Sequence, residues 1–265
     1  MNYQEKFNEL KDCGEKALIS FVVIGDPNYE LSLDVLRILA DKSDMLELGF
    51  AFSDPIADGS TIQSADVRAL NSGMNTDRNF RFIKEIRKFT DKPIGLLLYS
   101  NLVYQYGIDR FYFRAKEVGV NSILIADMPI EESEPYIKSA RKYNIDSVFI
   151  ISPLTKERRL RLILKETRGF VYLVSRLGVT GIREDIQKST LQLIRQVRTY
   201  TTLPVCVGFG ISKPDHIKAV LEAGADGVII GSAIVNIIEH NLKSKNKMLE
   251  NIKKFIIKAK EATKL

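Results

Sequence analysis

The sequence predicts an α/β fold in which short apolar strands alternate with amphipathic helices along all 265 residues. About eight strand–helix units fit into this length, which is close to the roughly 250 residues of a (β/α)8 barrel. No linker-like stretch interrupts the alternation. We therefore expect residues 1–265 to form a single-domain (β/α)8 TIM barrel with an extra N-terminal helix and extra helical segments. A doubly wound open sheet is the alternative.

The elements follow from hydrophobic periodicity and from capping and turn residues. Residues 2–13 should form the extra N-terminal helix, with Gly14 as its stop, and Asn28 should cap the next helix. The strands are expected at 18–24, 45–48, 94–98, 122–126, 147–151, 170–174, 204–207 and 227–230. The later helices are expected at 61–71, 77–89, 108–118, 132–143, 156–167, 187–199, 214–223, 232–239 and 246–262.

Composition and charge argue against several classes of function. The net charge of +6 comes from lysines and arginines scattered along the chain, without an aromatic-interleaved basic block, so we expect no nucleic-acid partner. No apolar run approaches the ~20 residues that span a bilayer, so no membrane association is expected. The N-terminus lacks the apolar core of a signal peptide. Two distant cysteines, Cys13 and Cys206, suit a reducing compartment, and we expect a cytoplasmic protein.

One acidic residue stands inside an expected buried strand. Glu47 lies within the apolar run 45–48, and the loop that follows carries Asp54 and Asp58. An ionised carboxylate costs several kcal/mol in such surroundings unless it is paired or takes up a proton. A buried acid at a strand end, followed by a loop with a second acid, is typical of a proton shuttle. The alternative is a structural glutamate held in a salt bridge inside the barrel.

Small residues follow the last three expected strands. These loops are 175–181, 208–212 and 231–235, and the third of them opens a helix. Glycine lets the backbone approach a ligand closely, and N–H groups at a helix N-terminus bind anions. Barrels of this kind hold phosphate at the loops after strands seven and eight. The set therefore predicts a phosphate site, although tight turns alone could also explain the glycines.

The remaining residue types restrict the reaction. His216 and His240 fall inside expected helices, so we expect no histidine-ligated metal. No lysine stands at an expected strand end, which argues against Schiff-base chemistry. We therefore expect a phosphorylated substrate on which carboxylates act by general acid–base catalysis. Apolar strand-end residues would line a pocket suited to a flat ring, namely Phe21, Leu97, Tyr99, Leu124, Ala126, Ile151 and Tyr172.

The combination of motifs resembles the tryptophan synthase alpha subunit family from the first helix to the last. The motifs are Leu46-Glu47-Leu48-Gly49, Phe52-Ser53-Asp54-Pro55, Ala57-Asp58-Gly59, Thr61-Ile62-Gln63, Ser175-Arg176, Gly178-Val179-Thr180-Gly181, Gly208-Phe209-Gly210-Ile211 and Gly231-Ser232-Ala233-Ile234-Val235. The resemblance implies a (β/α)8 lyase that cleaves indole-3-glycerol phosphate into indole and glyceraldehyde 3-phosphate. It also implies a beta-subunit partner in an αββα heterotetramer. Pyridoxal phosphate would belong to that partner, with no cofactor in this chain.

The same resemblance assigns roles by position. Glu47 and Asp58 match the two catalytic acids. Thr180 matches a position on a lid loop that closes onto the Asp58 loop. The positions that bind the substrate phosphate are matched by Gly181, Phe209, Gly210, Gly231 and Ser232. The pocket around the indole is matched by Phe21, Leu97, Leu124, Tyr172 and Phe209. The positions that face the beta subunit are matched by Asp54, Asn101 and Pro129.

The sequence departs from the family pattern on both sides of the Asp58 loop. Phe50-Ala51 replaces an aliphatic residue and a proline, and Ser60 replaces a common proline. Both changes should weaken loop ordering and coupling to the partner more than the chemistry at Glu47. Two other interpretations stay open. One is a different phosphate-binding barrel, such as indole-glycerol-phosphate synthase or a phosphosugar isomerase; the other is a non-catalytic barrel that activates a partner.

Overall fold

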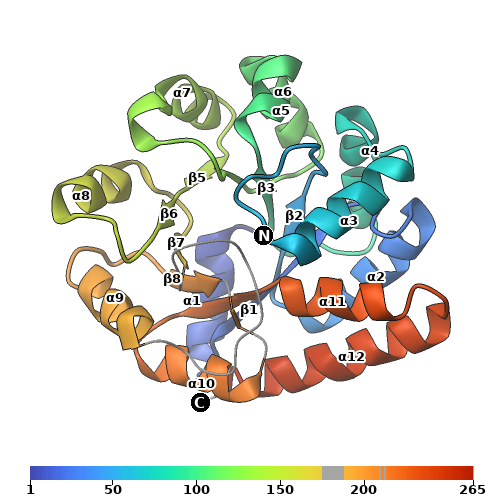
Figure 1. Ribbon diagram of the computed structural model, residues 1–265. Helices are drawn as coiled ribbons and strands as arrows, with labels where there is room; N and C mark the ends of the chain where they lie inside the picture. The colour runs from blue at the N-terminus through green and yellow to red at the C-terminus, as the bar shows by residue number, and fades with distance from the viewer. Residues whose placement is uncertain (175–187, 209, 212, 265) are drawn as a thin grey trace.

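The strands form one curved parallel sheet that is surrounded by helices (Figure 1). The computed structural model describes residues 1–174, 188–208, 210–211 and 213–264. Within these residues nine strands lie in the order β5-β4-β3-β2-β1-β9-β8-β7-β6. Strand β9 pairs in parallel with β1, so the first and last strands are neighbours. This order confirms the predicted barrel and rules out the doubly wound alternative.

The observed strands reproduce the expected ones with one difference. Their bounds are β1 Ala17–Val23, β2 Met45–Gly49, β3 Ile94–Leu98, β4 Ser122–Ile125, β5 Asp146–Val148, β6 Ile150–Ile151, β7 Val171–Val174, β8 Val205–Gly208 and β9 Gly227–Ile230. The single strand expected at 147–151 is wrong, because this stretch is divided at Phe149. Its first half pairs with β4, whereas its second half pairs with β7.

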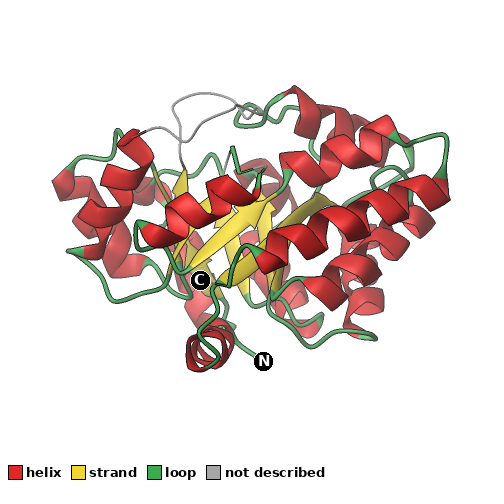
Figure 2. Ribbon diagram, turned by 90° about the horizontal axis from the view of Figure 1, so that it is seen from below, coloured by secondary structure: helices red, strands yellow, loops and turns green. Residues whose placement is uncertain are grey.

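Helices cover the outside of the sheet in both views (Figure 2). Their bounds are α1 Tyr3–Asp12, α2 Tyr29–Lys42, α3 Ser60–Asn71, α4 Thr76–Arg87, α5 Ser100–Tyr106, α6 Ile108–Glu117, 3-10 helix η1 Ile130–Glu132, α7 Glu134–Lys142, α8 Glu157–Glu166, α9 Lys188–Arg198, α10 Pro214–Glu222, α11 Ser232–His240 and α12 Lys245–Glu261. The sequence did not predict α5 or η1. The expected cap is confirmed, since the Asn28 side chain accepts the Leu31 N–H at 3.0 Å. In the described part of the chain, no helix is both long and apolar enough to cross a bilayer.

Helix α1 packs against the end of the barrel where the strands begin. The Tyr3 hydroxyl forms a 2.8 Å hydrogen bond with the hydroxyl of Ser122, the first residue of β4. The Tyr3 ring also lies 5.2 Å from that of Phe170, which precedes β7. Because α1 occupies this end, a ligand site is left to the opposite end, where the strands finish and the βα loops begin.

Candidate active site

Glu47 lies in the middle of β2, in which all five residues are buried. Its side chain is 3% exposed, and Oε2 has no hydrogen-bond partner among the described residues. Burial raises the pKa of this carboxyl to about 8. At neutral pH the group therefore keeps its proton, instead of standing as one half of an ion pair within the described structure. A protonated carboxyl held in this way can act as a general acid.

Asp58 lies in the loop between β2 and α3 and is 8% exposed. The Tyr99 hydroxyl donates a 2.6 Å hydrogen bond to Asp58 Oδ2 and accepts the Ala57 N–H at 3.1 Å. Burial raises the pKa of Asp58, and the hydrogen bond from Tyr99 opposes that rise. The Phe52 ring stacks on the Tyr99 ring, with centroids 5.2 Å apart. Tyr99 follows β3, so the neighbouring strand orients this acid.

Glu47 and Asp58 both influence the ionisation of one buried side chain, that of Tyr172. Tyr172 in β7 is buried, and burial is the main reason that its pKa lies well above the usual value. The charges of Glu47 and Asp58 both add to this rise. Charges interact appreciably only over short distances or through a poorly screened interior. When ionised, either acid therefore disfavours the charged form of Tyr172.

Four of the residues expected around the indole are described by the structure; they lie on four different strands and are all buried. Phe21 is on β1 and pairs in register with Glu47 on β2. Leu97 on β3 pairs in register with Leu124 on β4, and Tyr172 is on β7. The structure thus places apolar side chains next to the buried acid. Such surroundings favour a flat apolar ring over a charged ligand.

The glycine loops after β8 and β9 are neighbours because these strands pair in parallel. Gly210 has a positive φ of +77°, a conformation that favours glycine. Gly231 is the N-cap of α11, and Ser232 is its first residue. A Cβ at Gly231 would lie 2.7 Å from Phe21 Cδ1, so only glycine fits beside the expected indole pocket. The first N–H groups of a helix lack intrahelical partners and can bind an anion here.

Three other expected positions, Gly181, Thr180 and Phe209, lie outside the described residues. The loop 175–181, which contains two of them, also lies outside.

The residues expected to face a partner follow three adjacent strands. Asp54 follows β2, Asn101 lies on α5 after β3, and Pro129 follows β4. Asp54 and Asn101 are exposed, and Pro129 is half-buried. The structure therefore brings these three loops to the same end of the barrel.

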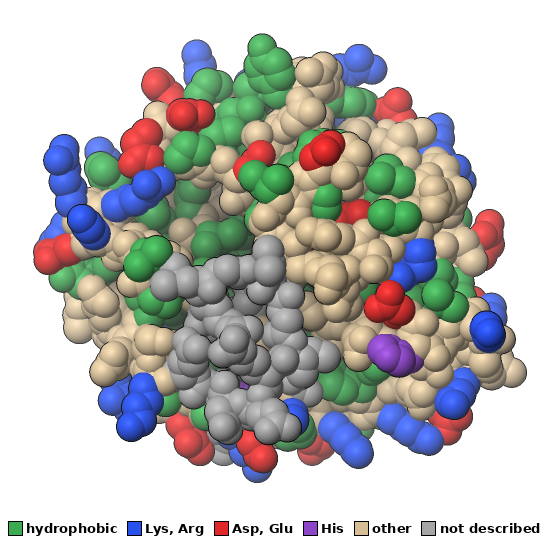
Figure 3. All heavy atoms as spheres, in the orientation of Figure 1, with side chains coloured by type: hydrophobic (Ala, Val, Ile, Leu, Met, Phe, Trp, Pro, Cys, Tyr) green, Lys and Arg blue, Asp and Glu red, His purple; other side chains and the backbone are tan. Residues whose placement is uncertain are grey.

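Figure 3 shows that lysine and arginine side chains on the face it draws lie mainly at the rim.

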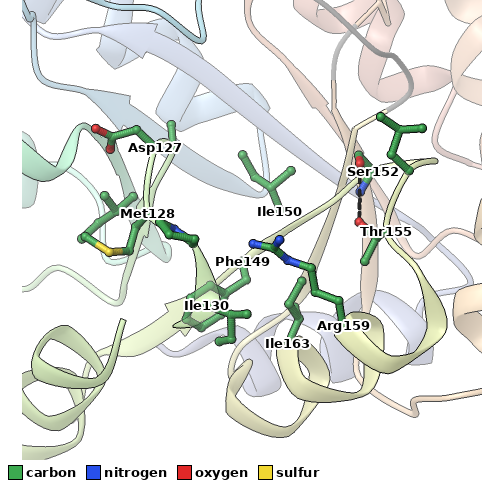
Figure 4. A pocket seen from close by; sticks show the side chains of 13 residues that line it. Asp127, Met128, Ile130, Phe149, Ile150, Ser152, Thr155, Arg159 and Ile163 are labelled. Carbon is green, nitrogen blue, oxygen red and sulfur yellow. Dashed lines mark hydrogen bonds between the residues drawn. The ribbon is translucent and has the colours of Figure 1, made fainter. Parts of the chain in front are cut away.

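A pocket of about 540 Å³ opens beside Pro129 (Figure 4). It lies between the loop after β4 and the loop after β6, and its lining includes Phe149, Ile150 and Arg159. Arg159 also pairs with Glu131 at 3.1 Å. Neither Glu47 nor Asp58 lines this pocket, so it belongs to the rim of the barrel end and not to the site around Glu47.

The sequence did not point to two features of the site. The first is the hydrogen bond by which Tyr99 holds Asp58, because Tyr99 was expected only as a pocket residue. The second is Asp66, a third buried acid on α3. Its signal in the sequence is a carboxylate on the helix face that also carries Ile62, Ala65 and Ala69. Among the described residues, no three histidine, cysteine, aspartate or glutamate side chains gather as metal ligands would.

Two of the three residues that depart from the family pattern are buried. Phe50 is buried, and its ring meets the Phe80 ring edge-on at 5.6 Å. Ala51 is buried, whereas Ser60 is exposed as the first residue of α3. A proline is well tolerated at this helical position, which explains how either residue fits there. The expected effect on loop ordering stays a prediction.

Comparisons with known proteins identify the family of this chain. The family model for the tryptophan synthase alpha chain matches residues 7–264. The chain belongs to the tryptophan synthase alpha chain family. The alpha chain of Methanothermobacter thermautotrophicus is 49% identical over 253 residues, which cover 95% of this chain and 93% of the relative. The alpha chain of Helicobacter pylori strain J99 is 46% identical over 258 residues, which cover 97% and 98% of the two chains.

Solved structures of tryptophan synthase have the same fold. A chain from the tryptophan synthase α2β2 complex of Pyrococcus furiosus matches with a TM-score of 0.86 and 39% identity, over 92% of this chain and 98% of that one. A chain of Mycobacterium tuberculosis tryptophan synthase matches with a TM-score of 0.91 and 25% identity, over 99% and 98%. The resemblance seen in the sequence is therefore confirmed, and with it the class of enzyme, a lyase of tryptophan biosynthesis.

Proposed function

We propose that Glu47 and Asp58 cleave indole-3-glycerol phosphate into indole and glyceraldehyde 3-phosphate. The observation that carries this proposal is the buried carboxyl of Glu47, which keeps its proton at neutral pH beside a second acid at the barrel end. The reaction needs a group that first gives a proton and then accepts one. A carboxyl with a pKa of about 8 can do both near neutral pH.

In the first step Glu47 donates its proton to the indole ring carbon that bears the side chain, which gives an indolenine. In the second step the Glu47 carboxylate takes the proton of the adjacent side-chain hydroxyl. The carbon–carbon bond then breaks, its electron pair restores the aromatic ring, and the hydroxyl carbon becomes the aldehyde of glyceraldehyde 3-phosphate. Asp58 accepts a hydrogen bond from the indole N–H and stabilises the positive charge that develops there.

The substrate would lie between the two groups of residues that the fold brings together. Its ring would contact Phe21, Leu97, Leu124 and Tyr172, all of which are buried at the barrel interior. Its phosphate would bind the backbone N–H groups at Gly210, Gly231 and Ser232, where two neighbouring loops end. Gly181, Phe209 and the lid residue Thr180 remain part of this proposal through the family resemblance alone.

We further propose that this barrel end binds a beta subunit in an αββα complex through Asp54, Asn101 and Pro129. Two structural relatives support this, since they come from tryptophan synthase complexes of Pyrococcus furiosus. Two side chains with large exposed apolar surface follow two of these strands, namely Ile56 after β2 and Tyr104 after β3. Pyridoxal phosphate would belong to the partner, with no cofactor in this chain. We also propose that residues 1–265 act as one domain in the cytoplasm.

The test is to measure indole release from indole-3-glycerol phosphate by the purified chain, with and without a tryptophan synthase beta subunit. We expect slow release from the chain alone and faster release when the partner is added. Absence of indole release in both samples, with the two chains still bound to each other, would contradict the proposed catalysis and favour a barrel that only activates its partner.

A further inference from the structure

Arg68 is a cation outside the proposed reaction that joins three elements of the barrel. It lies on α3, and its side chain is 17% exposed. Two of its guanidinium nitrogens donate hydrogen bonds to the two carboxylate oxygens of Asp26, at 2.6 and 3.0 Å. The third nitrogen lies 3.4 Å from a carboxylate oxygen of Glu239 on α11. Because Asp26 belongs to the loop after β1, one side chain links this loop, α3 and α11.

The geometry of the guanidinium makes this link a specific one. The Asp26 side chain is fully buried, and its two bonds from Arg68 fix the plane of the guanidinium. With that plane fixed, the third nitrogen is held toward Glu239. A lysine ammonium is a point charge without such a fork, so it would not hold both carboxylates in one arrangement. The contact pattern therefore favours a role in geometry over a role in charge alone.

The backbone of Asp58 is bonded to the body of α3. Asp58 lies just before the N-cap of this helix, which is Gly59. The Gln63 side chain, one turn into the helix, donates a 2.8 Å hydrogen bond to the Asp58 carbonyl. The Gln63 backbone N–H donates to the Gly59 carbonyl at 3.0 Å. The position of this acid therefore follows the position of α3.

The phosphate end of the site is bonded to α11 in a similar way. The Gly231 carbonyl accepts the N–H groups of Ile234 and Val235 at 2.8 and 3.0 Å. The N–H groups of Gly231 and Ser232, which we propose to bind the phosphate, thus belong to the beginning of this helix. Their position follows the position of α11.

Helices α3 and α11 pack side by side, and both also contact β1 (Figure 1). Each follows a strand of the barrel, so both begin at the end where the strands finish. Arg68 lies about 12 Å along α3 from its first residue, and Glu239 lies about 10 Å along α11. Their contact therefore joins the bodies of two helices whose first turns adjoin the two ends of the site. The spacing of these helices sets the distance between Asp58 and the phosphate-binding N–H groups.

We propose that Arg68 is a positioning residue that fixes the spacing of α3 and α11, and with it the distance between Asp58 and the phosphate-binding N–H groups. The inference rests on the proposed function, because it assumes that Asp58 binds the indole end of the substrate while α11 binds the phosphate. A short chain joins these two ends of indole-3-glycerol phosphate, so both are bound well only at one spacing. A misplacement of about 1 Å in such a site can cost about 100-fold in rate.

The test compares a ligand that has both ends with the two separate ends. The joined ligand is 3-(indol-3-yl)propyl phosphate, which lacks the hydroxyl groups of the substrate and so cannot undergo the cleavage. Its dissociation constant and those of indole and inorganic phosphate are measured by NMR titration of the purified full chain. For Arg68→Lys we expect the joined ligand to bind about 10-fold more weakly, while indole and phosphate each bind within about 2-fold of the unaltered chain.

A second variant covers the case in which Arg68→Lys does not fold. Glu239→Ala removes the contact with α11 and leaves the buried Asp26 paired with Arg68. It should weaken the joined ligand in the same selective way, by about 3-fold, because the lost contact is longer and more exposed. Unchanged binding of the joined ligand to this variant would contradict the proposed link between the two helices.

Arg87→Lys is the matched control. Arg87 on α4 also joins separate segments, since its guanidinium donates to the Lys92 carbonyl at 2.6 Å and to the Asn121 side chain at 2.9 Å. These two residues precede β3 and β4, at the end of the barrel away from the site. The control should leave all three dissociation constants within about 2-fold. A selective loss of the joined ligand here, equal to that in Arg68→Lys, would contradict a specific role for Arg68.

The outcomes also separate this inference from the proposed function. If the unaltered chain binds neither the joined ligand nor phosphate, the proposed function fails. If the joined ligand binds equally well to the unaltered chain and to Arg68→Lys, only the role of Arg68 fails. Losses for indole or phosphate that account for the whole loss of the joined ligand would show general damage to the site, and they too would overturn the role of Arg68.

Discussion

The Tyr99 hydroxyl donates a 2.6 Å hydrogen bond to Asp58 Oδ2, and this bond joins the end of β3 to the loop after β2. The same hydroxyl accepts the Ala57 N–H, and the Tyr99 ring stacks on Phe52. One side chain thus contacts the Asp58 loop at three points. The orientation of the Asp58 carboxylate therefore depends on a residue that follows the neighbouring strand.

Replacing Tyr99 by phenylalanine should lower kcat/KM for indole release. The change removes a hydrogen bond to a charged group and leaves Asp58 less well oriented, so we expect a loss of about 10-fold, or roughly 1.4 kcal/mol. Tyr104→Phe is the control, since Tyr104 follows the same strand but is 66% exposed. An equal effect of the two substitutions would show that Tyr99 does not orient Asp58.

Glu47→Gln should make the folded chain more stable at neutral pH. The unfolded chain releases the Glu47 proton near pH 4.5, whereas burial keeps the proton in the folded chain up to about pH 8. Stability therefore falls as the pH rises through this window, and glutamine removes that loss. We expect a gain on the order of 3 kcal/mol at neutral pH and almost none in acid, from urea unfolding. A stability difference that does not depend on pH would contradict the burial of a neutral Glu47.

Gly231→Ala should weaken the phosphate end of the site. The new Cβ would lie 2.7 Å from Phe21 Cδ1, so either the ring or the N-terminus of α11 must move. We expect inorganic phosphate to inhibit indole release about 10-fold less strongly, which corresponds to roughly 1.4 kcal/mol of lost binding. Phe21→Ala in the same chain supplies the control, because it removes the Cγ and Cδ1 atoms that the new Cβ would meet and should restore phosphate inhibition. Unchanged inhibition in the single variant would place the phosphate elsewhere.

Lys260→Met should destabilise the fold without changing catalysis. The Lys260 ammonium lies 2.9 and 2.8 Å from the two carboxylate oxygens of Asp44 and 2.8 Å from Glu15. Asp44 is buried just before β2, so the substitution would leave its charge without this partner. The pair lies at the end of the barrel where the strands begin, away from the site, so catalysis should not change. We expect a loss of about 2–3 kcal/mol in denaturant unfolding, with kcat/KM retained.

Lys258→Met is the matched control for that variant. Lys258 lies two residues earlier on α12 and is exposed, so its replacement should change stability by no more than about 0.5 kcal/mol. Comparable losses in the two variants would show that the pairing with Asp44 contributes nothing.

The sequence predicted the parts of the fold that follow from local patterns. Apolar runs mark the strands, and the single acid inside one of them marks Glu47 as a candidate catalytic residue. The predicted burial of Glu47 is confirmed. It could be predicted because a carboxylate within an apolar strand is a rare exception that the local sequence alone reveals. The same logic located the glycines at the ends of β8 and β9.

Other features depend on long-range packing and could not be predicted. The break at Phe149 arises because the two halves of one stretch pair with different strands, β4 and β7. Helix α5 is only seven residues long, and such a segment gives too few turns for a clear helical period. The burial of Asp66 was not predicted either, although it shares the face of α3 that carries Ile62, Ala65 and Ala69.

The central claim is that Glu47 transfers the protons that break the carbon–carbon bond. The most direct test is indole release from indole-3-glycerol phosphate by Glu47→Gln in the presence of beta subunit, together with a check that the variant is folded and binds its partner. Glutamine keeps the shape of the side chain but cannot give up and regain a proton in the same way. We predict that cleavage disappears while folding and partner binding remain. A variant that keeps most of the cleavage rate would contradict the assignment of Glu47.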